Sequence, residues 1–402
     1  MSQKLTREAE SLLPEMVTLR RDLHACPELG NSLPQTRARV LADLETLDLE
    51  FRLSEKTSSF VATLKGARPG ASVLLRADMD ALPMPEDTGL EFSSRQDGAM
   101  HACGHDAHTA MLVGAARLLS ARRSDLAGQV QFFFQSGEEG HFGAKICLAE
   151  GLLDEGPEPA MAFALHVETR LPVGRLASRP GPLMASADVW TIEVKGQGGH
   201  ASMPHDARDP IPAACEIVNA LQTMLTREIH AHDPVVISTT KIRAGTTNNV
   251  IPESAYLMGT LRATSEHGRR LAEEGIHRVA HGVSVAHGVE AIVNIEHGYP
   301  VTVNDPNAVT RAQRVASGLL SEEAFIEMPH PVMGAEDFSY VLDRWPGAML
   351  FIGVRPEAVE NPHPVHSNRM LLNESALSIG AALHAGVALD VLSDPAVAMR
   401  PA

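Results

Sequence analysis

The sequence predicts an α/β fold in which a small α+β domain is inserted into a larger α/β domain. In the first part of the chain, almost wholly apolar strands alternate with helices, which is typical of a sheet covered on both faces. In the middle, the element order changes to β-α-β-β-α-β, the split βαβ arrangement of ferredoxin-like domains. The change begins just after Gly181-Pro182, a dipeptide that favours turns.

The elements of the larger domain follow from hydrophobic periodicity. A helical pattern covers 12–23, 36–47 and 109–119, and the last of these has small or apolar residues on most faces, so we expect it to be buried. Short apolar runs bounded by polar residues predict strands at 72–75, 129–135, 161–167 and, after the middle part, 348–354.

The middle of the chain has a half-polar strand at 189–194 and an amphipathic helix at 209–228. Strands at 235–242 and 255–262, a helix at 266–282 and a strand at 289–295 complete the pattern. We therefore assign 1–184 and 298–402 to the larger domain and 185–297 to the inserted one.

Composition narrows the class of protein. Among 402 residues, 34 Lys and Arg stand against 50 Asp and Glu, a net charge of −16, and only 4% are aromatic. This balance argues against a nucleic-acid partner. No apolar run approaches the roughly 20 residues of a membrane span, and no apolar signal region follows the polar first residues. The four cysteines are scattered without a CxxC pair, so we expect a reduced, cytoplasmic protein without a membrane partner.

Histidine is the unusual residue, with 19 in the chain, and the densest cluster is MHACGHDAH at 100–108. His101, Cys103, His105 and His108 fall within eight residues, directly before a predicted helix. A thiolate and imidazoles at this spacing suit Zn²⁺ or a neighbouring divalent metal. The spacing alone leaves open which of the four are ligands.

A pair of carboxylates, Glu138 and Glu139, follows the predicted strand 129–135. In α/β sheets, ligands bind at this end of the strands. If the chain stays extended, the two side chains point in opposite directions, so that one can bind a metal while the other serves as general base. The alternative is a solvated acidic turn, which the pair by itself would favour.

Two further histidines gain weight only beside this cluster, and two aspartates allow two interpretations equally. His166 ends the strand 161–167 and His366 lies in PVHSN at 364–368; either alone would more often be a structural histidine. Asp78 and Asp80 follow the strand 72–75 and either orient a metal ligand or the base, or simply form a turn.

The inserted domain offers three candidates. His200 follows the glycines of GQGGH and could donate to an oxyanion. Asn249 in NVIP and Arg262 in GTLR could hold a substrate carboxylate. On their chemistry alone, ordinary glycine turns and a surface arginine would be the simpler interpretation.

Seven motifs in order resemble the M20 metallopeptidase family, and within it the amidohydrolase branch that includes hydrolases of N-acyl amino acids, hippurate and indole-acetyl-amino-acid conjugates. They run over essentially the whole chain: RRDLHACPELG (20–30), RADMDALP (76–83), MHACGHDAH (100–108), the Glu pair, GGHASMPH (198–205), NVIP with GTLR, and GAEDFS (334–339).

The resemblance implies a catalytic metal-binding domain and a lid domain that forms a homodimer. It implies two divalent ions (Zn, Mn, Co or Ni) bridged by Cys103, with the remaining ligands His105, Glu139, His166 and His366. Glu138 would be the general base. His200 of the partner subunit's lid would stabilise the oxyanion, and Asn249 and Arg262 would hold the substrate carboxylate.

The implied reaction cleaves N-acyl-L-amino acids to a carboxylic acid and a free amino acid; the alternative is a dipeptidase or exopeptidase with the same metal centre. A metal-storage protein would not need the spare carboxylate of Glu138, and a dimeric scaffold would not need the metal. The chain departs from the family pattern at Ser136-Gly137, where Pro-Ala is usual, at Leu33, where Glu is usual, and at Asn368, where Pro is usual. These departures bear on substrate choice more than on the chemistry.

Overall fold

The computed structural model describes residues 2–154, 156–357 and 359–394. The chain forms two compact units. The larger spans Met1–Gly181, Val303–Pro329 and Asp337–Ala402, and the smaller spans Pro182–Thr302 and His330–Glu336. The predicted insertion 185–297 lies within the smaller unit, which also takes 182–184, 298–302 and 330–336.

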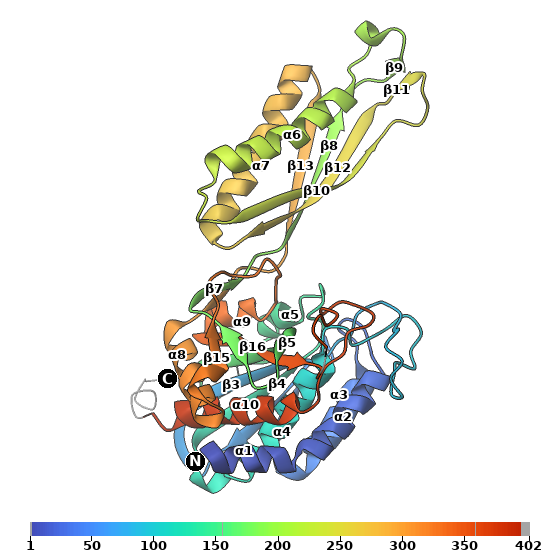
Figure 1. The fold of residues 1–402 in the computed structure, drawn as a ribbon. Coiled ribbons are helices and arrows are strands. Elements are labelled where there is room, and N and C mark those ends of the chain that lie inside the picture. The colour runs from blue at the N-terminus through green and yellow to red at the C-terminus, as the bar shows by residue number, and fades with distance from the viewer. Residues whose placement is uncertain (1, 155, 358, 395–402) are drawn as a thin grey trace. The chain divides into compact units, whose positions relative to one another are not determined.

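A mixed eight-stranded sheet forms the centre of the larger unit (Figure 1). Its four central strands, in the order β4-β3-β5-β16, are parallel, and β2 pairs antiparallel with β4. In sheet order the strands are β1 (Glu50–Leu53), β2 (Phe60–Lys65), β4 (Ala127–Gln135), β3 (Arg68–Asp78), β5 (Pro159–Pro172), β16 (Gly347–Arg355), β6 (Leu176–Ser178) and β15 (Phe325–Glu327). The mixed α/β fold class is confirmed.

Helices cover both faces of this sheet. Figure 1 shows α4 and α10 along one face and α5 and α9 on the other. The helices of the larger unit are α1 (Ser2–Ser11), α2 (Leu13–Ala25), α3 (Pro34–Leu44), α4 (His105–Ser120), α5 (Gly143–Ala149), α8 (Pro306–Leu319), α9 (Ser339–Arg344) and α10 (Ala376–Leu392). Because both faces are covered, the central strand β4 is buried from Gln129 to Gln135, as its apolar run predicted.

The parallel strands bring distant residues to one edge of the sheet. Asp78, the last residue of β3, lies opposite Gln135, the last residue of β4. On the other side of β3, the strand β5 carries His166 near the same end, beside Phe351 of β16. The carboxyl edge therefore gathers the sequence motifs that follow β3 and β4 with the histidine of β5.

The smaller unit has the predicted β-α-β-β-α-β order. Its antiparallel sheet runs β10-β12-β8-β13, and Trp190 and Leu257 are among the side chains buried between this sheet and the two helices. The elements are β8 (Asp188–Lys195), α6 (Pro210–Glu228), β10 (Val235–Ala244), β12 (Ser254–Ala263), α7 (Glu266–His287) and β13 (Glu290–His297). Two-stranded pairs are formed by β9 (Gly199–His200) with β11 (Val250–Ile251) and by β7 (Gly181–Met184) with β14 (Thr302–Asn304).

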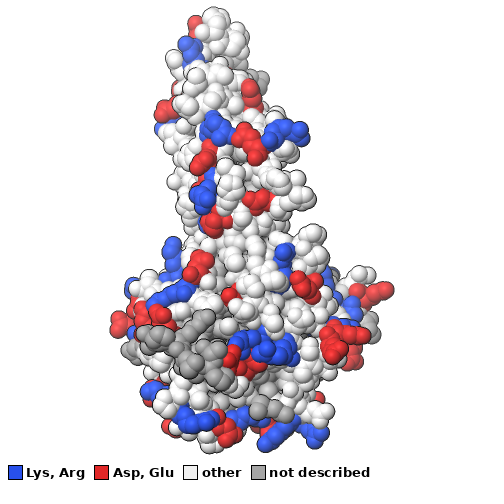
Figure 2. All heavy atoms as spheres, turned by 90° about the vertical axis from the view of Figure 1, so that its left-hand side faces the viewer, with Lys and Arg blue, Asp and Glu red and all other residues white. Residues whose placement is uncertain are grey.

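Within the described residues, no helix combines the length and the apolar character that crossing a membrane would need. Acidic and basic side chains are interspersed over the face shown in Figure 2, without a continuous basic stripe on that face.

Candidate metal centre

Cys103 and His105 lie on either side of Gly104, where the chain enters α4. Gly104 has φ 81° and caps the helix, and His105 is its first residue. A side chain at this glycine would meet Val167 of β5, since a Cβ would lie 2.5 Å from the valine Cγ2. Glycine therefore lets the loop pack directly on β5 and places Cys103 beside His166.

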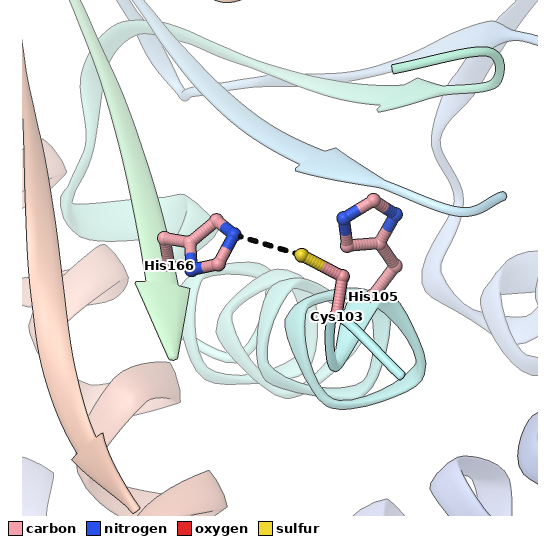
Figure 3. A group of neighbouring side chains, drawn as sticks. All are labelled: Cys103, His105 and His166. Atoms are coloured by element: carbon pink, nitrogen blue, oxygen red, sulfur yellow. Dashed lines mark hydrogen bonds between the residues drawn. The ribbon is translucent and has the colours of Figure 1, made fainter. Parts of the chain in front are cut away.

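Cys103, His105 and His166 form a buried group (Figure 3). The Cys103 Sγ lies 3.3 Å from the His166 Nε2. The His166 Nδ1–H donates to the backbone oxygen of Val167 at 2.8 Å, and this fixes the tautomer with Nε2 unprotonated toward the thiol. One potential ligand atom from each of the three residues lies within 4.8 Å of the others.

A second group shares Cys103 and adds Glu139 and His366. The Glu139 Oε1 lies 3.3 Å from the His366 Nε2 and 3.9 Å from the His105 Nε2. His366 has φ 65°, a left-handed conformation, and its backbone N–H donates to Ala102 O at 2.7 Å. The five residues that the resemblance implied as ligands thus converge, with Cys103 common to both groups.

The Glu pair does not lie in an extended chain, so the condition for the alternating arrangement is not met and the alternative, a turn, is what forms. The strand β4 ends at Gln135, and Glu138 and Glu139 lie in a turn. Both of their backbone N–H groups donate to the Asp80 carboxylate, at 2.9 and 3.0 Å. Asp80 is fully buried and therefore sets the placement of both carboxylates through the backbone.

Asp78 has a different role, because it holds the side chain of His108. Its Oδ1 accepts from the His108 Nδ1 at 2.6 Å, and the His108 Nε2 accepts from the Val167 N–H at 2.9 Å. Both nitrogens of His108 are thus engaged by protein groups. His105 differs, because neither of its ring nitrogens has a hydrogen-bond partner although the residue is fully buried.

A buried ion cluster that the sequence analysis did not foresee lies beneath Asp78. Arg76 donates to Asp78 at 2.7 Å, to Gln135 at 2.9 Å and to Asp337 at 3.1 Å. Gln135 and the backbone of Ala144 also donate to Asp337. The only signal for Asp337 in the sequence was its place in the motif GAEDFS, 261 residues from Arg76.

Two residues of the first sequence motif, 20–30, bind the first turn of α4. Asp106, next to His105, accepts from the Arg20 Nε at 2.7 Å and from the His24 Nδ1 at 2.8 Å. His101 is also buried, and burial lowers its pKa to about 3, so it is neutral. Its ring lies beside that of His24, with 6.3 Å between the ring centroids.

The electrostatics of the centre suit a bound cation. Burial, followed by the charges of Glu139 and Glu138, raises the pKa of the Cys103 thiol well above its usual range. For His105, burial lowers the pKa, but Asp78, Asp80 and Glu139 outweigh it and raise the pKa to about 10.

The donor set passes a direct test of fit to a metal. Besides both His105 nitrogens, the Glu139 Oε1 is buried without a partner in hydrogen-bond geometry, although the His366 Nε2 lies 3.3 Å away. An unsatisfied buried polar atom typically costs about 1–3 kcal/mol. Sulfur, imidazole and carboxylate ligands suit Zn²⁺, Mn²⁺, Co²⁺ or Ni²⁺. A divalent ion among them would engage the His105 Nε2 and the Glu139 Oε1, while the His105 Nδ1 faces the Asp80 carboxylate at 3.6 Å.

His200, Asn249 and Arg262 belong to the smaller unit. His200 is exposed in β9, its Nδ1 lies 2.8 Å from the Ser202 hydroxyl, and it pairs with Val250 directly after Asn249. The Ala201 N–H donates to the Asn249 carbonyl at 3.1 Å, so His200 and Asn249 lie together. Arg262 is half-buried on β12, away from this strand pair; burial lowers its pKa, partly offset by Asp188.

Thiol, imidazole and carboxylate groups gathered at the carboxyl edge of a parallel sheet are the ligand set of a metal-dependent hydrolase. The chain belongs to the peptidase family M20/M25/M40, whose match covers residues 74–390. It is accordingly a hydrolytic enzyme that acts on amide bonds.

Named relatives extend over nearly the whole chain. A thermostable carboxypeptidase of Saccharolobus solfataricus is 36% identical over 96% of this chain and 98% of its own length. An N-acetylcysteine deacetylase of Bacillus subtilis is 36% identical over 94% and 97%. An IAA-amino acid hydrolase of Arabidopsis thaliana is 37% identical over 95% and 86%.

Solved structures share the fold at similar identity. A putative aminohydrolase from methicillin-resistant Staphylococcus aureus has a TM-score of 0.92 and 30% identity, covering 98% of this chain and 100% of its own. A dinuclear metal-binding M20 peptidase from Bacillus subtilis has a TM-score of 0.83 and 33% identity, covering 95% and 99%. These likenesses support a centre for divalent metal ions.

Proposed function

We propose that this enzyme hydrolyses N-acyl-L-amino acids to a carboxylic acid and a free amino acid, using two divalent metal ions. The observation that carries the proposal is the convergence of five ligand-type side chains beside the buried Glu138. Of the five, Cys103, His105 and His166 are buried, Glu139 is partly buried and His366 is exposed. The deacetylase and amino acid hydrolase among the relatives support an acyl amino acid as substrate.

Cys103 is the shared ligand in this proposal, because it belongs to both groups of donors. His105, His166, Glu139 and His366 would complete the coordination of the two ions. Bound there, divalent ions supply Lewis acidity: they lower the pKa of water toward neutrality and polarise the substrate carbonyl.

Glu138 takes the proton of the attacking water as the C–O bond forms. The same carboxylic acid then protonates the leaving nitrogen as the C–N bond breaks, so that the base is regenerated. Its backbone N–H is held by Asp80 and its side chain is nine-tenths buried, which keeps the carboxylate within the centre. A positioned general base contributes about 10²–10⁴-fold to a rate.

His200 supplies the oxyanion donor in this proposal, and Asn249 and Arg262 bind the substrate carboxylate. The pairing of His200 beside Asn249 supports a shared role for the two. Loss of an oxyanion donor typically costs about 10²–10³-fold in rate. The resemblance to the family supports two further parts of the proposal: the inserted domain is a lid, and His200 acts from the partner subunit of a homodimer. The composition of the chain supports a cytoplasmic location.

The second candidate function is a metallo-exopeptidase or dipeptidase with the same centre. The carboxypeptidase among the relatives favours it. Both functions require a substrate carboxylate and a scissile amide, and they differ in whether an α-amino group lies on the acyl side. Rates on N-acetyl amino acids and on matched dipeptides separate them.

The variant Glu138→Gln tests the role of the base. We expect it to bind the same amount of metal as wild type and to lose about 10²–10⁴-fold in kcat, because the amide cannot accept the water's proton. Glu322→Gln, at an exposed position, is the matched control. Wild-type turnover by the Glu138 variant would refute its role as base.

A further inference from the structure

The turn that carries Glu138 and Glu139 is held on one side by Asp80, and a second contact holds it on the other side. This contact comes from Gly30, the last residue of the first sequence motif, and Asn31, both in the loop between α2 and α3. That stretch contains none of the proposed ligands. Its role must therefore come from the residues that it contacts.

The Asn31 side chain packs against the Cα of Gly137, the residue that precedes Glu138. Gly137 has φ 73°, and a Cβ placed on it would lie 2.1 Å from the Asn31 Oδ1 and 2.7 Å from its Cγ. A side chain at 137 is therefore excluded by the Asn31 amide as well as strained by the left-handed backbone. The amide occupies the space that a side chain at this position would fill.

The same amide also binds the far end of the turn. The Asn31 Nδ2 donates to the His141 backbone oxygen at 2.9 Å. The His141 ring in turn packs on Gly30, since a Cβ on that glycine would lie 3.2 Å from the ring Nε2. The two loops thus interlock, each with a glycine where the other has a side chain.

Asn31 is itself fixed to the sheet side of the site. Its backbone oxygen accepts from the Ser58 N–H at 2.8 Å and from the Ser136 hydroxyl at 3.4 Å. The Ser136 N–H donates to the Ser59 hydroxyl at 2.9 Å, so the chain entering the turn is held as well. Asn31 is therefore a rigid support rather than a loosely attached surface residue.

We propose that Asn31 is a positioning residue for Glu138 and Glu139, because its amide spans the turn from Gly137 to His141. The proposal rests on the proposed function for its effect on turnover, but not for its effect on metal ligation through Glu139. A displacement of about 1 Å in a catalytic group can cost about 10²-fold in rate. Asn31 touches neither substrate nor metal and acts only through the turn.

Two variants test this role. Asn31→Asp keeps the shape but replaces the amide donor by a carboxylate oxygen facing the His141 carbonyl, and Asn31→Ala removes the support behind Gly137. We expect each to lower kcat about tenfold or more with KM within about twofold. Ser32→Ala, at the exposed next residue, is the matched control and should behave as wild type.

A readout without substrate separates this proposal from the proposed function. The proteins are loaded with Co²⁺ alone, whose visible absorption reports ligand geometry. We expect both Asn31 variants to shift the Co²⁺ spectrum and Ser32→Ala to leave it unchanged. If wild type cleaves no acyl amino acid or dipeptide, the proposed function fails while this spectrum still tests Asn31.

A double-mutant cycle tests the contact itself. The Gly137→Ala methyl collides with the Asn31 amide in an otherwise wild-type chain, but enters vacated space in Asn31→Ala. The backbone strain at φ 73° is the same in both, so it cancels from the comparison. We expect Gly137→Ala to cost about tenfold less kcat in the Asn31→Ala background. Equal costs, or Asn31 variants with wild-type kcat and Co²⁺ spectrum, would overturn the proposal.

Discussion

Asp80→Asn changes one oxygen of the group that holds the Glu pair. The Asp80 carboxylate accepts the Glu138 N–H on Oδ1 and the Glu139 N–H on Oδ2. An asparagine can accept only one of them, and its amide nitrogen would face the other N–H. A hydrogen bond to a charged group contributes about 1.5–3 kcal/mol. If that loss appears in the transition state, kcat falls by about 10–150-fold.

The assay measures kcat and KM for an N-acetyl amino acid at saturating metal, together with the metal content. Metal content is needed because Asp80 also lies 3.6 Å from the His105 Nδ1. Asp87→Asn is the matched control, since Asp87 forms an exposed ion pair with Arg369, and pairs of this kind contribute little. Wild-type kcat in fully loaded Asp80→Asn would refute the view that Asp80 places the base.

Two further predictions concern protons and charge. The pKa of Cys103 is raised and that of His105 is about 10, so both side chains carry a dissociable proton at pH 7. Metal binding should therefore release about two protons, and the apparent affinity for the metal should rise from pH 6 to pH 9. Calorimetry in buffers of different ionisation enthalpy measures the proton number, and no release would contradict this. Arg76→Met leaves Asp78 and Asp337 buried without their cation, and we expect urea unfolding to show a loss of about 3–5 kcal/mol; a loss below about 1 kcal/mol would contradict it.

Local patterns predicted the parts of the fold that have a clear period. The buried run of β4 and the amphipathic helix α6 were predicted within about two residues. The helix α10 was not predicted, because it is apolar and buried on nearly every face and therefore has no amphipathic period. The short strands β6 and β15, of three residues each, are also below what periodicity can detect.

The candidate site was predictable where the ligand-type residues are close in sequence. A turn at the Glu pair was the alternative to an extended chain, and Gly137 and Gly140, which bracket the pair, were the available signal for it. The approach of His366 to Glu139 depends on a backbone bond to Ala102, across a separation that no local pattern reports. The departure at Ser136-Gly137, which we first connected with substrate choice, is packed against Asn31.

The central claim is metal-dependent hydrolysis of acyl amino acids by this centre. The most direct test is amine release from a panel of N-acyl-L-amino acids and dipeptides by chelator-treated enzyme, before and after adding Mn²⁺, Zn²⁺, Co²⁺ or Ni²⁺. We predict no release without metal and restored release from the acyl amino acids with at least one ion. Full activity without metal, or release from dipeptides alone, would contradict the account.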